Sequence, residues 1–362
     1  MTQNTSENST FQKNQKKRKA WKYILIVLLL LIVILLICGV ALSFYVMGKL
    51  RDGTEPIPIV SRDGTYTLPP EPDNIVTAHP DDTEPDTEEP TPGSETDPPE
   101  TSNDPIWGKD PIDPNVINIL LLGRDAREQY ERGRSDSMII ASYNKVTHKI
   151  KLINILRDCL VPIEGHDWTR INEAYSYGGI GLCINTVNDV FELDIQNYIT
   201  VDFDGLIRIV DAVGGIDVSL TAEEITYYQS KGWGDQLKPG MNRLNGTEAL
   251  HHARNRTLGN DFERTRRQRD ILIAICNRVT SSATLSQVIS MIDEALDIVS
   301  TNLSYSTLVS LATDVMQNRN ALTFETGRVP FDGTYRGAWY NKMLIIQIDI
   351  AENTRLLREF LK

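Results

Sequence analysis

The sequence predicts one α/β domain with a central mixed β-sheet and helices on both faces, behind a single N-terminal transmembrane helix and a disordered stalk. Three observations support this prediction. A long uncharged apolar run lies near the N-terminus, an acidic proline-rich tract follows it, and β-branched runs then alternate with helical periods over some 250 residues. Because no internal repeat is visible, we predict a single three-layer α-β-α domain over residues 115–362.

Residues 23–48 contain no charged side chain and are mostly aliphatic. About 20 such residues cross a bilayer as a helix, whereas the apolar part of a cleaved signal peptide, the alternative, is typically only about 7–15 residues long. Lysines and arginines cluster between residues 13 and 22, and only Lys49 and Arg51 follow the run closely. The positive-inside rule therefore predicts a single-pass protein of the cell membrane, with a cytoplasmic basic tail at residues 1–22 and an extracellular C-terminal domain.

Residues 49–114 are rich in proline, threonine and acidic side chains. Between Asp81 and Asp104 there are ten acidic residues and five prolines but no basic residue. Such a segment buries too little apolar surface to fold, and charge repulsion and proline stiffness keep it extended. We expect a disordered stalk; an acidic cation-binding tract is the weaker alternative.

The elements of the domain follow from changes of hydrophobic period. Asn245 and Asp261 are expected to cap the two helices around the arginine-rich segment. Strands are expected at residues 116–122, 137–144, 149–156, 197–203, 216–220, 322–329 and 343–350, and helices at 175–191, 204–215, 246–254, 262–279, 284–299, 305–317 and 351–361.

The segment from His251 to Arg269 contains six arginines and no lysine, in a chain whose formal net charge is −12. Arginine recognises phosphate-type oxyanions through bidentate hydrogen bonds, and a helix N-terminus also favours an anion. Helical spacing places Arg264, Arg267 and Gln268 on one face, where we favour anion binding, with Asp261 orienting an arginine. For Arg266 and Arg269 a solvated surface with salt bridges is the preferred interpretation.

Two aspartates lie where the first two expected strands meet. Asp125 follows the first strand and Asp136 precedes the second, so both are expected at one edge of the sheet. Carboxylates without histidine or cysteine partners suit a hard divalent cation, although loop acids at strand ends are the ordinary alternative. Arg157 and Asp158 reach the same edge if the third strand is antiparallel to the second.

The remaining candidate metal ligands and reactive groups have structural explanations. The four cysteines include no CxxC pair, which disfavours a zinc site or a disulfide framework, and Cys159, Cys183 and Cys276 are expected to be buried and inert. His251 and His252 are adjacent and point in different directions, so we assign them to packing or to the helix surface.

Seven motifs in order resemble the LytR-CpsA-Psr family of cell-wall enzymes. They are LLLGRDAR, GRSDS, NILRD, RINEAYSYGG, VDAVGGIDV, LNGTEALHHARNR and DFERTRRQR, and they cover residues 115–280. Two positions depart from the family pattern. His251 and His252 stand where an aromatic residue often precedes the arginines, and Glu263 stands where many members have glycine.

The resemblance implies a phosphotransferase that moves a glycopolymer, such as teichoic acid or capsule, from a polyprenyl-pyrophosphate carrier to peptidoglycan through a phosphodiester. It implies Mg²⁺, or alternatively Mn²⁺, on Asp125 and Asp136. Carried over by position, the catalytic residues would be Asp125, Asp136, Arg157, Arg254, Arg256, Asp261 and Arg264. The pyrophosphate would be bound by Arg134, Arg157, Arg170, Arg254, Arg256, Arg264, Arg267 and Gln268.

The resemblance also implies a channel for the carrier lipid. The apolar stripes of helices 175–191 and 203–213 are candidates on this analogy alone, with plain core as the more ordinary explanation. Two other function classes remain. A non-catalytic protein that binds or senses polyprenyl pyrophosphate also explains the arginines, but it does not need the aspartates. Nucleic-acid binding is disfavoured because the domain is acidic and is expected outside the cell.

Overall fold

The computed structural model describes residues 68–79, 113–124 and 135–362, which all belong to one compact unit, Pro56–Lys362. The expected basic tail, the transmembrane run and most of the stalk lie outside the described residues, as do Asp125 and Arg134. Among the residues that are described, no helix is both long and apolar enough to cross a membrane.

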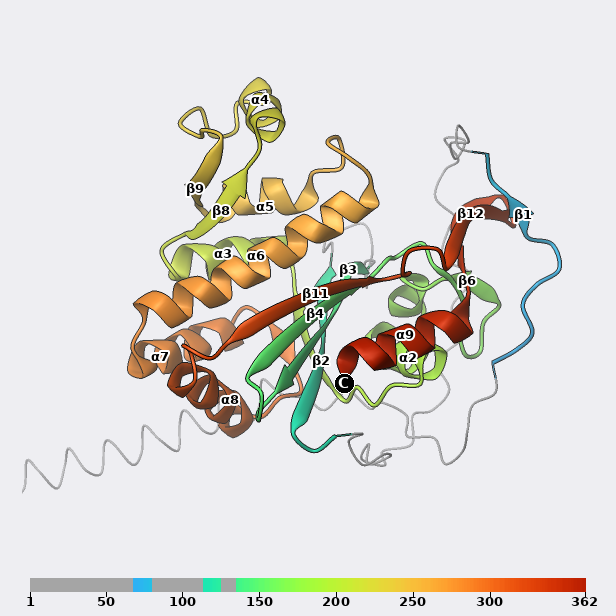
Figure 1. Ribbon diagram of the computed structural model, residues 1–362, viewed down its shortest axis with the longest axis horizontal. Coiled ribbons are helices and arrows are strands. Elements are labelled where there is room, and N and C mark those ends of the chain that lie inside the picture. The colour runs from blue at the N-terminus through green and yellow to red at the C-terminus, as the bar shows by residue number, and fades with distance from the viewer. Residues whose placement is uncertain (1–67, 80–112, 125–134) are drawn as a thin grey trace, which may run out of the picture. The chain divides into compact units, whose positions relative to one another are not determined.

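A mixed six-stranded sheet forms the centre of the domain, in the order β10-β7-β2-β3-β4-β11 (Figure 1). β2 and β3 are antiparallel, as are β3 and β4, whereas β7 runs parallel to β2 and β11 runs parallel to β4. The strands are β2 (Val116–Arg124), β3 (Ser135–Asn144), β4 (Lys149–Ile155), β7 (Asn197–Val201), β10 (Ser300–Thr301) and β11 (Thr323–Val329). The central mixed sheet expected from the sequence is therefore present.

One face of the sheet is covered by α2 (Glu173–Phe191) and α9 (Ile350–Leu361). Leu120 of β2 and Ile140 of β3 are fully buried against Cys183 and Ile184 of α2, and Leu357 of α9 joins the same core. The apolar stripe of α2 is thus filled core. This agrees with the ordinary explanation of that stripe, rather than with a lipid channel along it.

The opposite face carries α6 (Asp261–Ser282), which also packs against a second core outside the sheet. Gln268 and Arg269 of α6 contact Asn154 of β4. Val210, Ile216 and other apolar residues bury the remaining side of α6. They belong to α3 (Phe203–Ala212), β8 (Ile216–Leu220), α4 (Ala222–Ser230), β9 (Gly240–Leu244) and α5 (Gly246–Arg254). Helices therefore lie on both faces of the sheet, as expected for three layers.

Two helices are only lightly buried. In α7 (Leu285–Leu296) and α8 (Tyr305–Gln317) the buried residues are Val288 and Met316, one in each helix. On the sheet face that bears α6, apolar side chains of β2 are also only partly buried. Ile119 and Leu121 stay half-exposed, whereas Leu120 and Leu122 on the other face are buried. Apolar side chains on this side of the domain thus keep accessible surface.

Residues 68–79 depart from the expectation of a disordered stalk. Val76–Thr77 forms β1, which pairs antiparallel with Trp339 and Ala338 of β12, and Ile75 packs on the apolar cluster behind that strand. These few apolar residues supply the burial that the acidic tract lacks. The small sheet contains β1, β12 (Tyr335–Tyr340) and β13 (Met343–Ile348), beside the hairpin of β5 (Leu160–Pro162) and β6 (Trp168–Arg170).

Several boundaries differ from the sequence prediction. The N-cap of α6 is Asn260, whose side chain accepts hydrogen bonds from the backbone N–H groups of Phe262 and Glu263, and Asp261 is the first helical residue. Asn245 caps α5 as expected, in a capping box with Glu248. The sequence reading missed β1, β5, β6, α4, β9, β10 and β12, most of which are short.

Candidate anion-binding site

The ends of five strands meet at one edge of the sheet. The pairing places Arg124 opposite Ser135, Gly123 beside Ser137 and Val201, and Ile155 beside Met138 and Val329. The sequence neighbours of both aspartates, Arg124 and Ser135, are therefore paired. The antiparallel pairing of β3 and β4 also brings Arg157, two residues past β4, to this edge, as expected.

Arg264 is the central cation of α6. Its side chain is 3% exposed, and its Nη2 lies 2.7 Å from Oδ1 of Asp261. Its Nε is buried and has no hydrogen-bond partner among the residues that the structure describes. A buried guanidinium with an unused donor is costly unless a further acceptor binds there. The expected pairing of Asp261 with an arginine is present, and Arg264 retains capacity for an anion.

Gln268 connects this helix to the edge of the sheet. Its Oε1 accepts a hydrogen bond from Oγ of Ser137 at 2.9 Å and a longer one from Asn154 at 3.4 Å. Ser137 directly follows Asp136 in β3. The face of α6 that bears Arg264 and Gln268 thus lies against β3, whose second residue is Asp136.

Arg267, placed on that face by helical spacing, is engaged elsewhere. Its Nε donates to Glu224 of α4 at 2.8 Å, and its other nitrogens donate to the carbonyl oxygens of Asn255 and Leu258. Both side chains of the ion pair are 4% exposed. Burial disfavours the charged carboxylate, yet the Thr221 backbone N–H and Arg267 hold the pKa of Glu224 below its usual value. In this structure Arg267 joins α6 to α4.

His252 belongs to the same buried cluster. Its Nδ1 lies 2.9 Å from the hydroxyl of Tyr228, and burial lowers the imidazole pKa to about 4, partly opposed by Glu224. His251 instead stacks on Trp233, with 3.9 Å between the ring centres. The packing role expected for both histidines is confirmed.

Arg254 and Arg256 leave the end of α5 with exposed side chains. The guanidinium of Arg254 lies 4.1 Å from the ring centre of Phe203, the first residue of α3. Phe203 stands two residues after β7, whose last residue pairs with Gly123 of β2. The stacking therefore holds Arg254 near the same sheet edge as Arg124.

Two further predicted cations lie close to Asp158. Nε of Arg157 is 3.4 Å from one carboxylate oxygen of Asp158, and Nε of Arg170 is 3.5 Å from the other. Arg170 also donates to the carbonyl oxygen of Leu344. Burial, then the charges of Asp158 and Asp261, raise the pKa of the Cys159 thiol, so this segment lies near the start of α6.

Arg269 and Arg328 were missed by the sequence reading. Arg269 was assigned to a solvated surface, but it is 8% exposed and donates to Asn154 at 2.6 Å; burial lowers its pKa. Arg328 of β11 stacks on Phe262, with 4.3 Å to the ring centre. Arg266, in contrast, pairs with Glu263 and Asp270 at the surface, as expected. Arg328 lies in a strand far along the chain from the other arginines, so no local sequence pattern indicates it. For Arg269, helical spacing wrongly predicted a solvent-exposed side chain.

Asp125 and Asp136 are the two candidate metal ligands. Asp136 lies in β3 beside the register shift between Gly123 and Arg124, and Asp125 is outside the described residues. Within the described ranges, no three His, Cys, Asp or Glu side chains gather as a metal site. Arg124 and Ser135, the sequence neighbours of the two aspartates, pair at this edge, and carboxylates are ligands that a hard cation accepts together with water and phosphate oxygens.

The fold and these cations define an α/β protein with a cluster of arginines, a candidate anion site, at one edge of a mixed sheet. A profile of the LytR_cpsA_psr family matches residues 90–356, which is most of the chain. The chain belongs to the LytR_cpsA_psr family.

Three relatives show the extent of the similarity. The chain is 34% identical over 235 residues to the polyisoprenyl-teichoic acid–peptidoglycan teichoic acid transferase TagU of Oceanobacillus iheyensis, covering 62% of this chain and 71% of TagU. It is 34% identical to the corresponding transferase TagV of Bacillus subtilis, covering 52% of this chain and half of TagV. The fold matches YwtF (TagT) with bound octaprenyl pyrophosphate, with a TM-score of 0.53, 22% identity, and coverage of 71% of this chain and 94% of that one.

Proposed function

We propose that this protein is a phosphotransferase that attaches a glycopolymer from a polyprenyl-pyrophosphate carrier to peptidoglycan through a phosphodiester. Family membership and the names of its relatives as teichoic acid transferases support the reaction class. The arginines of the anion site supply the charge that a pyrophosphate requires.

One contact carries the proposal, the hydrogen bond between Ser137 and Gln268 at 2.9 Å. It holds the face of α6 that bears the underused Arg264 against the start of β3. In the proposed site, the donors of α6 thus lie beside the start of β3, where Asp136 is the candidate cation ligand, although the two segments are distant in the sequence. A protein that merely carried charge on its surface would not need this arrangement.

In the proposed reaction, the acceptor hydroxyl attacks the phosphorus of the sugar-linked phosphate and the bond to the polyprenyl phosphate breaks. Arg264, held by Asp261, stabilises negative charge on the phosphoryl oxygens, and Arg254 and Arg157 do so from the neighbouring strand ends. The proton of the attacking hydroxyl passes to a carboxylate at this edge. Mg²⁺ held by Asp125 and Asp136, or Mn²⁺ in its place, would act as a Lewis acid toward the pyrophosphate oxygens.

The carrier lipid is proposed to lie on the sheet face shared with α6, α7 and α8. Ile119 and Leu121 keep accessible apolar surface there, and α7 and α8 add half-buried apolar side chains. This face replaces the stripe of α2, which is filled core. A polyprenyl chain covering these side chains would remove apolar area from water, at about 25 cal/mol per Å².

We further propose the location predicted from the sequence, with residues 23–48 as a membrane anchor and the domain outside the cell. The carrier lipid is confined to the membrane and the acceptor lies in the wall beyond it. A tethered domain reaches both.

The deciding experiment incubates the purified chain with a polyprenyl-pyrophosphate-linked sugar, a glycan acceptor and Mg²⁺. We expect a phosphodiester-linked product, little product with EDTA, and loss of turnover in Asp125→Asn. Absence of product from the parent protein, with retained binding of the carrier, would instead favour a non-catalytic binder or sensor.

A further inference from the structure

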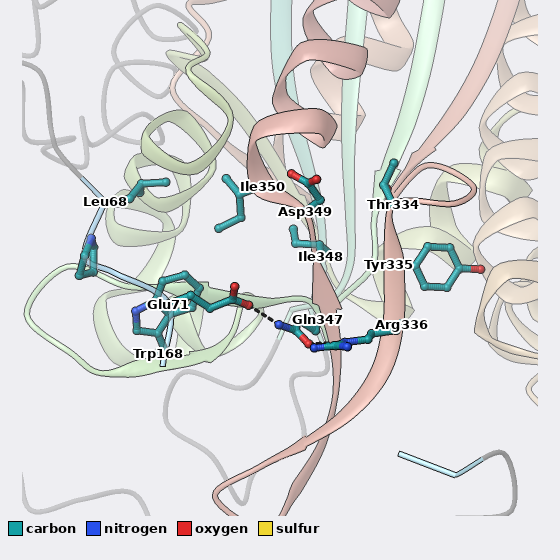
Figure 2. Close-up of a pocket in the computed structure, with 11 residues that line it drawn as sticks. Leu68, Glu71, Trp168, Thr334, Tyr335, Arg336, Gln347, Ile348, Asp349 and Ile350 are labelled. Carbon is teal, nitrogen blue, oxygen red and sulfur yellow. Dashed lines mark hydrogen bonds between the residues drawn. The ribbon is translucent and has the colours of Figure 1, made fainter. Parts of the chain in front are cut away.

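A cavity lies outside the arginine cluster, between residues 68–71 and the small sheet of β12 and β13. It is a cavity of about 510 Å³, within the range of natural ligand sites. Figure 2 shows Glu71 beside the indole of Trp168, with Gln347 between Glu71 and Arg336. The wall is thus formed by four segments that are distant in the sequence.

The polar side chains of this cavity are already ordered by one another. Nε2 of Gln347 donates to Oε1 of Glu71, and Nε of Arg336 donates to Oε1 of Gln347, both at 2.6 Å. The chain of contacts fixes three planar groups that together offer both donors and acceptors. Donors and acceptors fixed in this way can form hydrogen bonds with a ligand that carries several hydroxyl groups.

Trp168 gives the cavity an apolar side. Trp168 packs on the cluster of Leu160 and Ile345 and also lines the cavity. Its indole nitrogen is shielded from solvent and has no hydrogen-bond partner within the described part of the chain. An aromatic surface beside ordered polar groups matches a pyranose ring, which has an apolar C–H face and a rim of hydroxyls.

The charge of the cavity differs from that of the anion site. Arg336 is its one cation among the lining residues, against the carboxylates of Glu71 and Asp349. An anionic polymer is therefore disfavoured here, and an uncharged sugar is favoured.

The cavity borders the anion site. Tyr335 lines the cavity and its ring centre lies 5.5 Å from that of Phe262, the neighbour of Asp261. Trp168 and Arg170 belong to the same short strand, β6. A glycan held in the cavity would therefore lie beside the phosphate-binding arginines.

We propose that this cavity binds uncharged pyranose units of the acceptor glycan, with residues 68–71 as one wall. The binding of a neutral glycan stands on the cavity alone, whereas its role as acceptor rests on the proposed function. A segment of the expected stalk thereby becomes part of the substrate site.

The test titrates chitotetraose, an uncharged N-acetylglucosamine tetramer, into the full-length chain in lipid nanodiscs, with binding followed by ligand-observed NMR. We expect a dissociation constant in the millimolar range or tighter, weakened at least five-fold by Glu71→Ala and by Arg336→Ala. Both residues are exposed, so the variants should fold. The matched control is Asp73→Ala, an exposed acid of the same segment that does not line the cavity.

Each outcome has a defined meaning. Failure of chitotetraose to bind, or binding that is indifferent to both substitutions, would overturn the site. Poly(glycerol phosphate) is the anionic probe; if its binding depended on Glu71 as strongly, the cavity would hold donor polymer and the acceptor assignment would be wrong. Turnover of the parent without chitotetraose binding would remove this inference only, whereas binding without turnover would remove the proposed function and leave the cavity.

Discussion

At the residue scale, arginines of one helix have three different roles. Arg264 has a buried donor without a partner among the described residues, Arg267 is engaged with Glu224 and two carbonyl groups, and Arg266 forms surface ion pairs. The proposed anion binding, an internal ion pair and a surface ion pair thus fall to the same kind of side chain, depending on what surrounds it.

The distinction predicts different effects on turnover. Arg264→Ala should lower kcat about 10²–10³-fold, the usual cost of losing one preorganised donor to a developing charge. Arg266→Ala, at a solvent-exposed position two residues away, is the matched control and should keep nearly the parent rate. Steady-state kinetics with a lipid-pyrophosphate donor measures both. Equal losses in the two variants would contradict the role assigned to Arg264.

His252 predicts a pH dependence of stability. Its pKa is about 4 in the folded chain and 6.5 in the reference state, so the unfolded state binds more protons between these values. Stability is therefore full above pH 6.5 and falls as the pH is lowered toward 4, with a loss of about 2 kcal/mol at pH 5. Thermal unfolding of the parent and of His252→Gln at pH 7.5 and pH 5 should show a smaller pH effect in the variant. His166→Gln, at an exposed histidine, is the control.

At the scale of elements, α6 is held from two sides by buried polar contacts. Arg269 reaches Asn154 of the sheet, and Arg267 reaches Glu224 of α4. Helical periodicity indicated one buried face, but the neighbouring elements bury the helix on more than one side, which a single amphipathic pattern does not reveal.

Breaking the contact to α4 should destabilise the domain strongly. Glu224→Ala would leave the guanidinium of Arg267 buried without its carboxylate, at a cost of about 3–5 kcal/mol in unfolding free energy. Asp217→Ala is the matched control, because it removes an Arg243 pair of similar geometry whose side chains are 47% and 48% exposed. That pair should contribute little, because solvent screens its exposed charges. Urea titrations of the two variants measure the difference. Equal shifts of the two midpoints would contradict the larger contribution of the buried pair.

The two faces of β2 predict opposite consequences for neighbouring residues. Leu121→Ser should raise KM for a lipid-linked donor with a modest loss of stability, because Leu121 lies half-exposed on the proposed lipid face. Leu120→Ser should mainly lower stability, since Leu120 is fully buried under α2. Kinetics and thermal unfolding of both variants separate the two effects. A normal KM for Leu121→Ser would place the lipid elsewhere.

At the scale of the whole molecule, the described unit holds the arginines, and the sequence places an apolar run and a basic cluster before it. The proposed reaction needs the domain on the side of the membrane where the wall lies. The location remains a prediction from charge asymmetry.

Protease added to intact cells tests this location directly. We expect a C-terminal tag to be digested and an N-terminal tag to stay protected until the membrane is disrupted. A cytosolic reporter protein is the control for cell integrity. Protection of the C-terminal tag would place the domain inside and remove the access to peptidoglycan that the function requires.

The sequence by itself determined the order of the main strands and helices and the segments that carry the chemistry. Periods of two and 3.6 residues are local properties, so β2, β3, β4 and α6 were predicted close to their observed bounds. The two segments of acids and arginines were also evident from composition.

Only the tertiary structure decided which of these side chains are buried and engaged by distant elements. The sequence placed Arg267 on the anion-binding face and Arg269 at a solvated surface. The burial and the partners of these two side chains instead depend on α4 and β4, which are distant along the chain. Residues 68–79 follow the same logic. Their composition favours disorder, but pairing with β12 satisfies their backbone and buries Ile75. The free energy that orders this segment comes from long-range contacts, which a local sequence pattern does not predict.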